Sequence, residues 1–211
     1  MIKKRKKLRI SLLCLFLLLI CFSIGAVYYV LQNTNSILPW QKKTVKEQLL
    51  KYEPTISNEL NKYQLQSFTP LLLAIMYQES YGKGNDPMQS SESAGLKRNE
   101  IQDPENSIKQ GVYHFYQMYK YGTKLQVDLD TIIQSYNMGP GYIDFVASHG
   151  GKHTEELAKE YSKMQVERSP SVYMCKGIKG SFRSPYCFGD FSYTKKVKDK
   201  IPFAQQVLQK K

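Results

Sequence analysis

The chain has 211 residues and a formal net charge of +12, which suits one ordinary domain with attached segments. Residues 1–31 hold six Lys or Arg and no acidic residue, so half of the excess charge belongs to this segment. The remainder shows neither a basic stripe nor a recognised nucleic-acid-binding motif, which argues against a nucleic-acid partner. Its mild basicity suits an anionic partner of another kind.

An uncharged apolar segment covers residues 10–31 directly after a Lys/Arg cluster. It is long enough to cross a hydrocarbon core of about 30 Å as a helix, with the basic cluster kept in the cytoplasm. A cleaved signal peptide is the alternative, although the run is longer than usual and lacks a clear small-x-small cleavage site. We therefore predict a cytoplasmic segment (1–9), a single-pass transmembrane signal anchor (10–31), a linker (32–44) and an extracellular domain (45–211).

The extracellular part shows apolar residues at steps of three and four, which is the helical period. Thr69-Pro70 and Asp103-Pro104 are strong helix starts, because a capping side chain precedes a proline at the first helical position. Residues 170–193 are ambiguous and leave a small hairpin open. Since no other run alternates as strands do, the domain is predicted to be mainly α. Helices are expected from Val45, from Pro54, over 70–81, from Pro104, and over 129–136, 142–148, 154–164 and 194–208.

One carboxylate lies on the apolar face of the helix predicted over 70–81. The residues that share this face are Leu72, Ile75, Met76 and Glu79. Desolvation disfavours a charged carboxylate, so the pKa of Glu79 should rise towards the value that a general acid needs. Asp86 follows in a turn between Asn85 and Pro87, where we expect it to be solvated. Two carboxylates in such unlike surroundings are typical of glycoside hydrolysis, although a solvated surface glutamate is the commoner arrangement.

Several short motifs of residues 45–208 resemble the goose-type-lysozyme-like domain of Gram-positive wall hydrolases. The resemblance is strongest to the pneumococcal vaccine antigen A-like branch, and the GPG element is similar to that of soluble lytic transglycosylases. The pair of QES-x-G and GPG, in this order and spacing, is specific, whereas either alone is weak. The motifs are Gln78–Gly82 (QES-x-G), Asp86–Ser93 (DPMQSSES), Asp103–Val112 (DPENSIKQGV), Ser135–Ile143 (SYNMGPGYI) and Phe188–Val197 (FGDFSYTKKV).

The resemblance implies a lysozyme-like (goose-type, transglycosylase-like) helical domain behind the transmembrane helix. It implies an N-acetylmuramidase that cuts the β-1,4 bond between N-acetylmuramic acid and N-acetylglucosamine, with Glu79 as acid and Asp86 as candidate base. Peptidoglycan strands would be the partner of a monomeric protein that needs no cofactor. For residues 89–92 a self-capping loop stays open as an alternative role, and for Tyr142 a core aromatic. The residues expected to line the sugar groove are Gln89, Ser90, Ser91, Glu92, Tyr136, Asn137, Gly139 and Tyr142.

Two other functions remain open at this point. A lytic transglycosylase would use the 6-hydroxyl of the sugar in place of water and release 1,6-anhydro products. A non-catalytic peptidoglycan-binding adaptor for wall synthesis or conjugation machinery belongs to a different class of protein, and an intact Glu79 argues against it.

The cysteines and histidines give weaker signals. Cys175 and Cys187 lie in the predicted extracellular domain, where disulfides persist, and both a structural bridge and two free thiols are open. The three histidines, His114, His149 and His153, lack a metal-ligand spacing, so no metal site is predicted.

Overall fold

The computed structural model describes residues 20, 22, 23, 25, 39–175 and 183–209. The chain divides into two units, Met1–Lys43 and Thr44–Lys211, which are treated separately. The predicted transmembrane segment, residues 10–31, lies almost entirely outside the described residues. Among the residues that are described, no helix is both long and apolar enough to cross a membrane.

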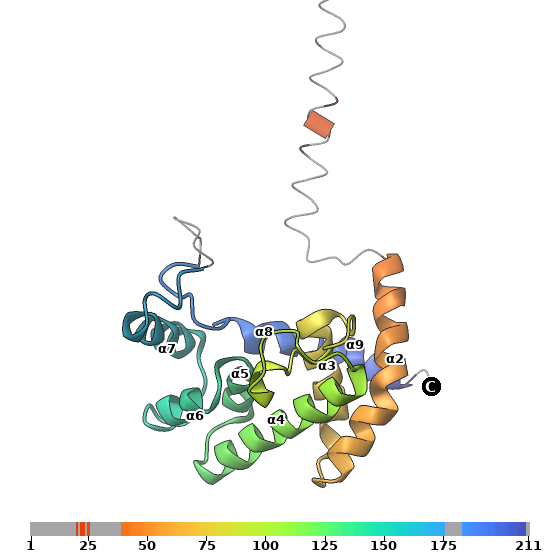
Figure 1. The fold of residues 1–211 in the computed structure, drawn as a ribbon, viewed down its shortest axis with the longest axis horizontal. Coiled ribbons are helices and arrows are strands. Elements are labelled where there is room, and N and C mark those ends of the chain that lie inside the picture. The colour runs from red at the N-terminus through yellow and green to blue at the C-terminus, as the bar shows by residue number, and fades with distance from the viewer. Residues whose placement is uncertain (1–19, 21, 24, 26–38, 176–182, 210–211) are drawn as a thin grey trace, which may run out of the picture. The chain divides into compact units, whose positions relative to one another are not determined.

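The second unit is built from helices joined by loops and short 3-10 turns (Figure 1). No strand occurs in residues 44–175 and 183–209, so the mainly α class is confirmed, and the described part of 170–193 contains no hairpin. The helices are α2 (Pro39–Asn61), which begins in the first unit, η1 (Gln66–Phe68), α3 (Thr69–Ser80), η2 (Glu92–Ala94), α4 (Pro104–Lys124), α5 (Leu129–Met138), α6 (Pro140–Ala147), α7 (Glu155–Arg168), α8 (Tyr193–Lys198) and α9 (Ile201–Gln209).

The capping signals that are visible in the sequence define several of these helices. Asp103 caps α4 by accepting a hydrogen bond from the N–H of Glu105, and Pro104 follows at the first turn. Asp128 caps α5 and Thr154 caps α7 in the same way. The predicted start at Thr69-Pro70 is shifted by one residue, because Phe68 holds the N-cap position of α3.

Two helix predictions are wrong, and both involve proline. Pro54 lies inside the single helix α2 and does not begin a second one, because the buried stripe that includes Leu49 and Ile56 continues across it. The helix predicted over 194–208 is two helices, α8 and α9. Pro202 has no N–H to donate to the carbonyl of Lys198, so the helix is interrupted: α8 ends at Lys198 and α9 begins at Ile201.

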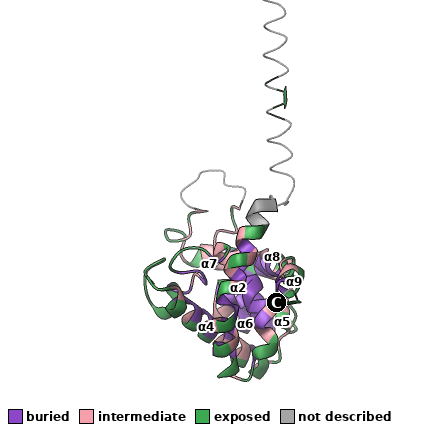
Figure 2. Cartoon of the chain, turned by 90° about the vertical axis from the view of Figure 1, so that its right-hand side faces the viewer, coloured by how far each residue is buried: buried purple, intermediate pink, exposed green. Residues whose placement is uncertain are grey.

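Helix α3 is the central element of this unit. Its residues Thr69 to Tyr77 are all buried except Pro70, which is typical of a helix that is apolar on every side. It packs against α8 and α9, while α5 packs against α4, α6 and α8. Figure 2 shows the buried residues in purple inside the unit and the exposed ones in green on its outer turns. The last turn of α3 therefore brings Glu79 to the edge of the core.

A second core lies between α5, α6 and α7. Its buried members are Met138, Tyr142, Val146, Ala158 and Tyr161, and the partly buried Phe145, Met164, Phe188 and Phe191 pack against them.

Candidate active site

Glu79 occupies the last turn of α3, where its side chain is only partly exposed. The helix ends directly afterwards, because Tyr81 adopts the left-handed conformation with φ 61°. The hydroxyl of Tyr193 donates a hydrogen bond of 2.5 Å to Oε1 of Glu79. The second oxygen, Oε2, has no hydrogen-bond partner among the described residues. Because no buried side-chain oxygen in this part of the chain lacks a partner, Oε2 must be in contact with solvent.

The surroundings of Glu79 make its carboxyl group hold the proton more tightly than a solvated glutamate does. Burial raises the pKa of Glu79 to about 7, which outweighs the lowering by the Tyr193 hydrogen bond and by the charge of Arg98. The negative charges of Asp190 and Asp86 raise this pKa a little further. The apolar stripe in the sequence predicts this environment. A carboxyl group with such a pKa can donate a proton at the pH where cells grow.

Two buried tyrosines support this carboxyl group. Tyr193 begins α8, is 1% exposed, and lies parallel to the ring of Tyr136 with 6.5 Å between centroids and 5° between planes. The hydroxyl of Tyr136 donates in turn to the carbonyl of Met88 at 3.0 Å. Burial holds the pKa of both phenols well above the ordinary value, so both stay protonated and act as donors.

Asp86 is buried and not solvated, which corrects the expectation from the sequence. Its side chain accepts hydrogen bonds from the backbone N–H groups and the hydroxyls of Ser90 and Ser91, and from the hydroxyl of Ser107 on α4. Burial alone would raise the pKa of Asp86, but the hydrogen bonds from Ser107, Ser91 and Ser90 together lower it below the ordinary value. The turn after α3 folds inwards because this serine run and α4 supply the donors that a buried carboxylate needs.

The same geometry changes the interpretation of the two serines. Ser90 and Ser91 are each 1% exposed, and their side chains point to Asp86. They therefore do not line a sugar groove as expected, and they belong to the anchor that holds this loop to α4. The alternative of a self-capping loop is not supported either, because Ser91, the N-cap residue of η2, makes no side-chain capping hydrogen bond.

The other two loop residues remain near the surface. Gln89 is partly buried with φ 47°, and its amide donates to the carbonyl of Asp86 at 3.0 Å and to Oδ1 of Asn99 at 2.8 Å. Glu92 is exposed at the start of η2.

The SYNMGPGYI motif divides into buried and exposed members. Tyr136 is buried beside Tyr193, Asn137 is exposed, and Gly139 has φ 76° at the junction of α5 and α6. Tyr142 is fully buried in the second core, where its hydroxyl lies 2.7 Å from Nδ1 of His153. The expectation that Tyr142 stacks on a sugar ring is therefore wrong, and the core alternative holds.

The segment before α8 contributes residues that the sequence analysis did not single out. The backbone N–H of Asp190 donates to Oδ1 of Asn137 at 2.6 Å, and its carbonyl accepts from Gln134 at 2.7 Å. The Asp190 carboxylate pairs with Lys196 at 2.6 Å. Asp190 and Tyr193 both lie in the FGDFSYTKKV motif, so that resemblance was the signal that could have found them.

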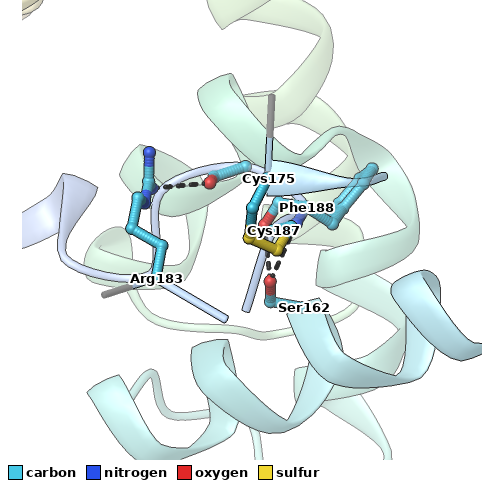
Figure 3. The surroundings of a disulfide bond; sticks show 6 residues. Ser162, Cys175, Arg183, Cys187 and Phe188 are labelled. Atoms are coloured by element: carbon cyan, nitrogen blue, oxygen red, sulfur yellow. Dashed lines mark hydrogen bonds between the residues drawn. A yellow bond between two sulfur atoms is a disulfide. The ribbon is translucent and has the colours of Figure 1, made fainter. Parts of the chain in front are cut away.

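A disulfide joins Cys175 to Cys187 beside this segment. Figure 3 shows the bridge next to Phe188, whose N–H and carbonyl both meet the hydroxyl of Ser162 on α7, at 3.1 and 2.7 Å. Arg183 donates to the carbonyl of Gly189 at 2.8 Å. The bridge and these hydrogen bonds hold the chain immediately before Asp190.

No group of three or more His, Cys, Asp or Glu side chains within the described residues is arranged to hold a metal ion.

Comparison with known proteins gives a consistent result. The protein-family model described as Lysozyme-like matches residues 46–205. The uncharacterized membrane protein YocA of Bacillus subtilis (strain 168) is 54% identical over 92% of this chain and 88% of its own length. Pneumococcal vaccine antigen A of Streptococcus pneumoniae serotype 4 is 40% identical over 57% of this chain. The bifunctional muramidase/DL-endopeptidase CwlT of Bacillus subtilis (strain 168) is 44% identical over 46% of it.

The last two relatives are matched only in part, over 59% and 28% of their own lengths. A solved structure from Staphylococcus aureus, described as similar to a lipoprotein of the NLP/P60 family, superposes with a TM-score of 0.64 at 34% identity. It covers 74% of this chain and 52% of the other. The matched family model spans the helices and the site described above, so the chain belongs to the lysozyme-like family and resembles its pneumococcal vaccine antigen A branch.

Proposed function

We propose that this protein is a membrane-anchored peptidoglycan hydrolase, an N-acetylmuramidase that cleaves the β-1,4 bond between N-acetylmuramic acid and N-acetylglucosamine. Membership of the lysozyme-like family supports a cell-wall glycosidase. The similarity to a relative named as a muramidase supports the choice of bond, although that relative matches less than half of this chain.

The observation that carries the proposal is the largely buried Glu79 carboxyl group, which accepts a hydrogen bond from Tyr193 at the edge of the core. Oε1 accepts the hydrogen bond of Tyr193, so the acidic proton resides on Oε2, the oxygen in contact with solvent. From Oε2 the proton passes to the glycosidic oxygen as the bond to C1 of the muramic acid breaks. The rigid pair Tyr193 and Tyr136 keeps the carboxyl oriented for this transfer.

The second half of the reaction needs a nucleophile at C1. In the hydrolase, water attacks and a carboxylate takes its proton, a role for which Asp86 is the candidate base. The five hydrogen bonds to Asp86 instead favour a role in anchoring the loop. This observation supports a lytic transglycosylase as the second candidate. In that reaction the 6-hydroxyl of the muramic acid attacks C1, and Glu79 acts first as acid and then as base.

The products distinguish the two reactions. The full-length chain in detergent is incubated with purified peptidoglycan, and the soluble fragments are analysed by mass spectrometry. A hydrolase releases muropeptides with a reducing end, whereas a transglycosylase releases 1,6-anhydro products that are lighter by one water. Glu79→Gln should release neither. Glu156→Gln removes an exposed carboxylate of α7, outside the site, and is the matched control.

Two outcomes would contradict the catalytic proposal. Equal release by the wild type and Glu79→Gln would remove Glu79 from the mechanism. Binding of peptidoglycan with no release by the wild type would support the non-catalytic adaptor.

The membrane anchor is proposed for residues 10–31, with the N-terminus in the cytoplasm and the domain facing the wall. Protease added to intact protoplasts should then degrade the domain and leave the N-terminal segment protected. Protection of the domain from the protease would show the opposite topology, with the domain in the cytoplasm. Release of a shortened chain into the medium would identify the cleaved signal peptide.

A further inference from the structure

The backbone at the end of α5 contains a carbonyl that its own helix cannot satisfy. In an α-helix the carbonyl of Tyr136 would accept from the N–H four residues later, and that residue is Pro140, which has no N–H. Gly139 donates to the carbonyl of Ser135 at 2.7 Å, and α6 begins at Pro140. Leaving a buried carbonyl unpaired costs about 1–3 kcal/mol, so a partner is needed here.

His114 on α4 is that partner. Its Nε2 lies 3.1 Å from the carbonyl oxygen of Tyr136. Because a carbonyl can only accept, Nε2 carries the hydrogen and Nδ1 holds the lone pair. The imidazole meets the Tyr136 ring edge-on, with 4.9 Å between centroids and 64° between planes. Burial lowers the pKa of His114, against the smaller raising effect of this hydrogen bond, so the ring is neutral.

The other ring nitrogen of His114 is available to accept a hydrogen bond from solvent. Nδ1 has no hydrogen-bond partner in residues 39–175 and 183–209. Since no buried side-chain nitrogen or oxygen in these residues lacks a partner, Nδ1 remains in contact with solvent.

Two residues of α4, Gly111 and His114, lie against opposite ends of Tyr136. Gly111 lies against the hydroxyl of Tyr136, where an added Cβ would come within 2.9 Å of the oxygen. His114 lies one helical turn later and binds the carbonyl of the same residue. The next residue, Asn137, is exposed and holds the N–H of Asp190. The position of Asn137 is therefore determined by both ends of Tyr136 and by Asp190.

We propose that His114 is a positioning residue for glycan binding, in that its Nε2–H fixes the carbonyl of Tyr136 and so places Asn137 and Gly139 against the substrate. This inference rests on the proposed function, since it assumes that Asn137 and Gly139 contact a β-1,4-linked N-acetyl sugar chain. In this role the imidazole of His114 does not contact the glycan, and it influences glycan binding only through the backbone that it holds.

Binding is tested separately from cleavage, in the full-length Glu79→Gln chain, so that the glycan stays intact. Sedimentation with insoluble peptidoglycan measures the dissociation constant. His114→Leu, which has no donor, should weaken binding about tenfold, the effect of roughly one hydrogen bond. His114→Gln places an amide N–H where Nε2–H was and should restore affinity to within about threefold.

His149 supplies the matched control, because its ring also meets a backbone carbonyl, that of Phe145, at the exposed end of α6. His149→Leu should bind as tightly as the parent. Equal binding by the His114→Leu and parent chains would overturn the inference and leave the proposed function standing. Failure of His114→Gln to recover would also overturn it, because the loss would then reflect packing and not the donor.

A second measurement does not depend on any activity. Nitrogen-15 NMR of histidine-labelled chain should show the resonance pair of His114 with Nε2 protonated and Nδ1 bare. The three histidines are assigned from their variants. Protonation at Nδ1 would overturn the inference even if His114→Leu failed to fold. Failure of the Glu79→Gln chain to bind peptidoglycan would count against the proposed function, and the NMR result would still decide whether Nε2–H holds the Tyr136 carbonyl.

Discussion

The hydroxyl of Tyr193 donates a 2.5 Å hydrogen bond to Oε1 of Glu79, across 114 residues of sequence. This contact holds the carboxyl group while leaving Oε2 in contact with solvent. Because the hydrogen bond stabilises the charged form, it also lowers the pKa of Glu79 against the stronger effect of burial.

Tyr193→Phe should therefore raise the pKa of Glu79 and weaken its orientation. We expect the alkaline limb of the pH profile of kcat/KM to move to higher pH, and kcat/KM at its optimum to fall about tenfold. The ring stack on Tyr136 is kept, so the fold should survive. Tyr142→Phe loses a similar hydroxyl contact, to His153 in the second core, and should leave the profile unmoved. An unchanged alkaline limb in Tyr193→Phe would remove Tyr193 from the site.

Glu79→Gln should stabilise the protein in a pH-dependent way. The folded pKa, about 7, is above the ordinary value of a glutamate, so the folded state binds the proton more tightly than the unfolded state. The wild type then loses stability as pH rises between these two values, by on the order of 3 kcal/mol. Urea unfolding should find the variant more stable by about this amount at pH 8 and nearly equal to the wild type at pH 4. A constant difference across this range would mean that Glu79 is not desolvated.

Ser107→Ala should destabilise the loop that Asp86 anchors. The variant loses the 2.6 Å hydrogen bond to the Asp86 carboxylate, which is worth about 2 kcal/mol. Because the folded pKa of Asp86 lies below its ordinary value, its contribution to stability is present above that value and is lost on acidification. The variant should therefore begin to unfold at a higher pH than the wild type. Ser67→Ala, on the exposed η1, is the control and should change stability by less than about 0.5 kcal/mol.

The double variant Cys175→Ala/Cys187→Ala should lower the free energy of unfolding by about 3 kcal/mol, because the bridge constrains the unfolded chain. Thermal unfolding of the wild type with a reductant should reproduce this loss. The matched control is Cys14→Ala/Cys21→Ala, which removes the two cysteines of the apolar segment 10–31 and should leave both curves unchanged. Insensitivity of the wild type to reductant would show that the two thiols are free.

The features that could be predicted from the sequence are those set by local spacing. The apolar stripe places Glu79 at the edge of the core, and Asp103-Pro104 begins a helix, because both depend on residues within a few positions. The burial of Asp86 could not be predicted in this way. Its donor Ser107 lies 21 residues further along the chain, so the same turn would be solvated without α4.

Tertiary packing also decides the remaining errors. Pro54 is tolerated inside α2 because the helix buries Leu49 and Ile56 on either side of it. Tyr142 lies in a motif that contributes residues to the site, but its ring fills the core formed with α7. In both cases the local pattern was compatible with two outcomes, and contacts with distant helices selected one.

The long sequence separation between Glu79 and Tyr193 has a consequence for biosynthesis. Glu79 leaves the ribosome 114 residues before Tyr193, so for most of translation the acid exists without the phenol that orients it. A shorter delay, of 53 residues, separates Asn137 from Asp190, whose N–H binds it. An oriented acid is therefore acquired only after the C-terminal helices have been made, and a chain truncated before α8 would carry Glu79 without its hydrogen-bond donor.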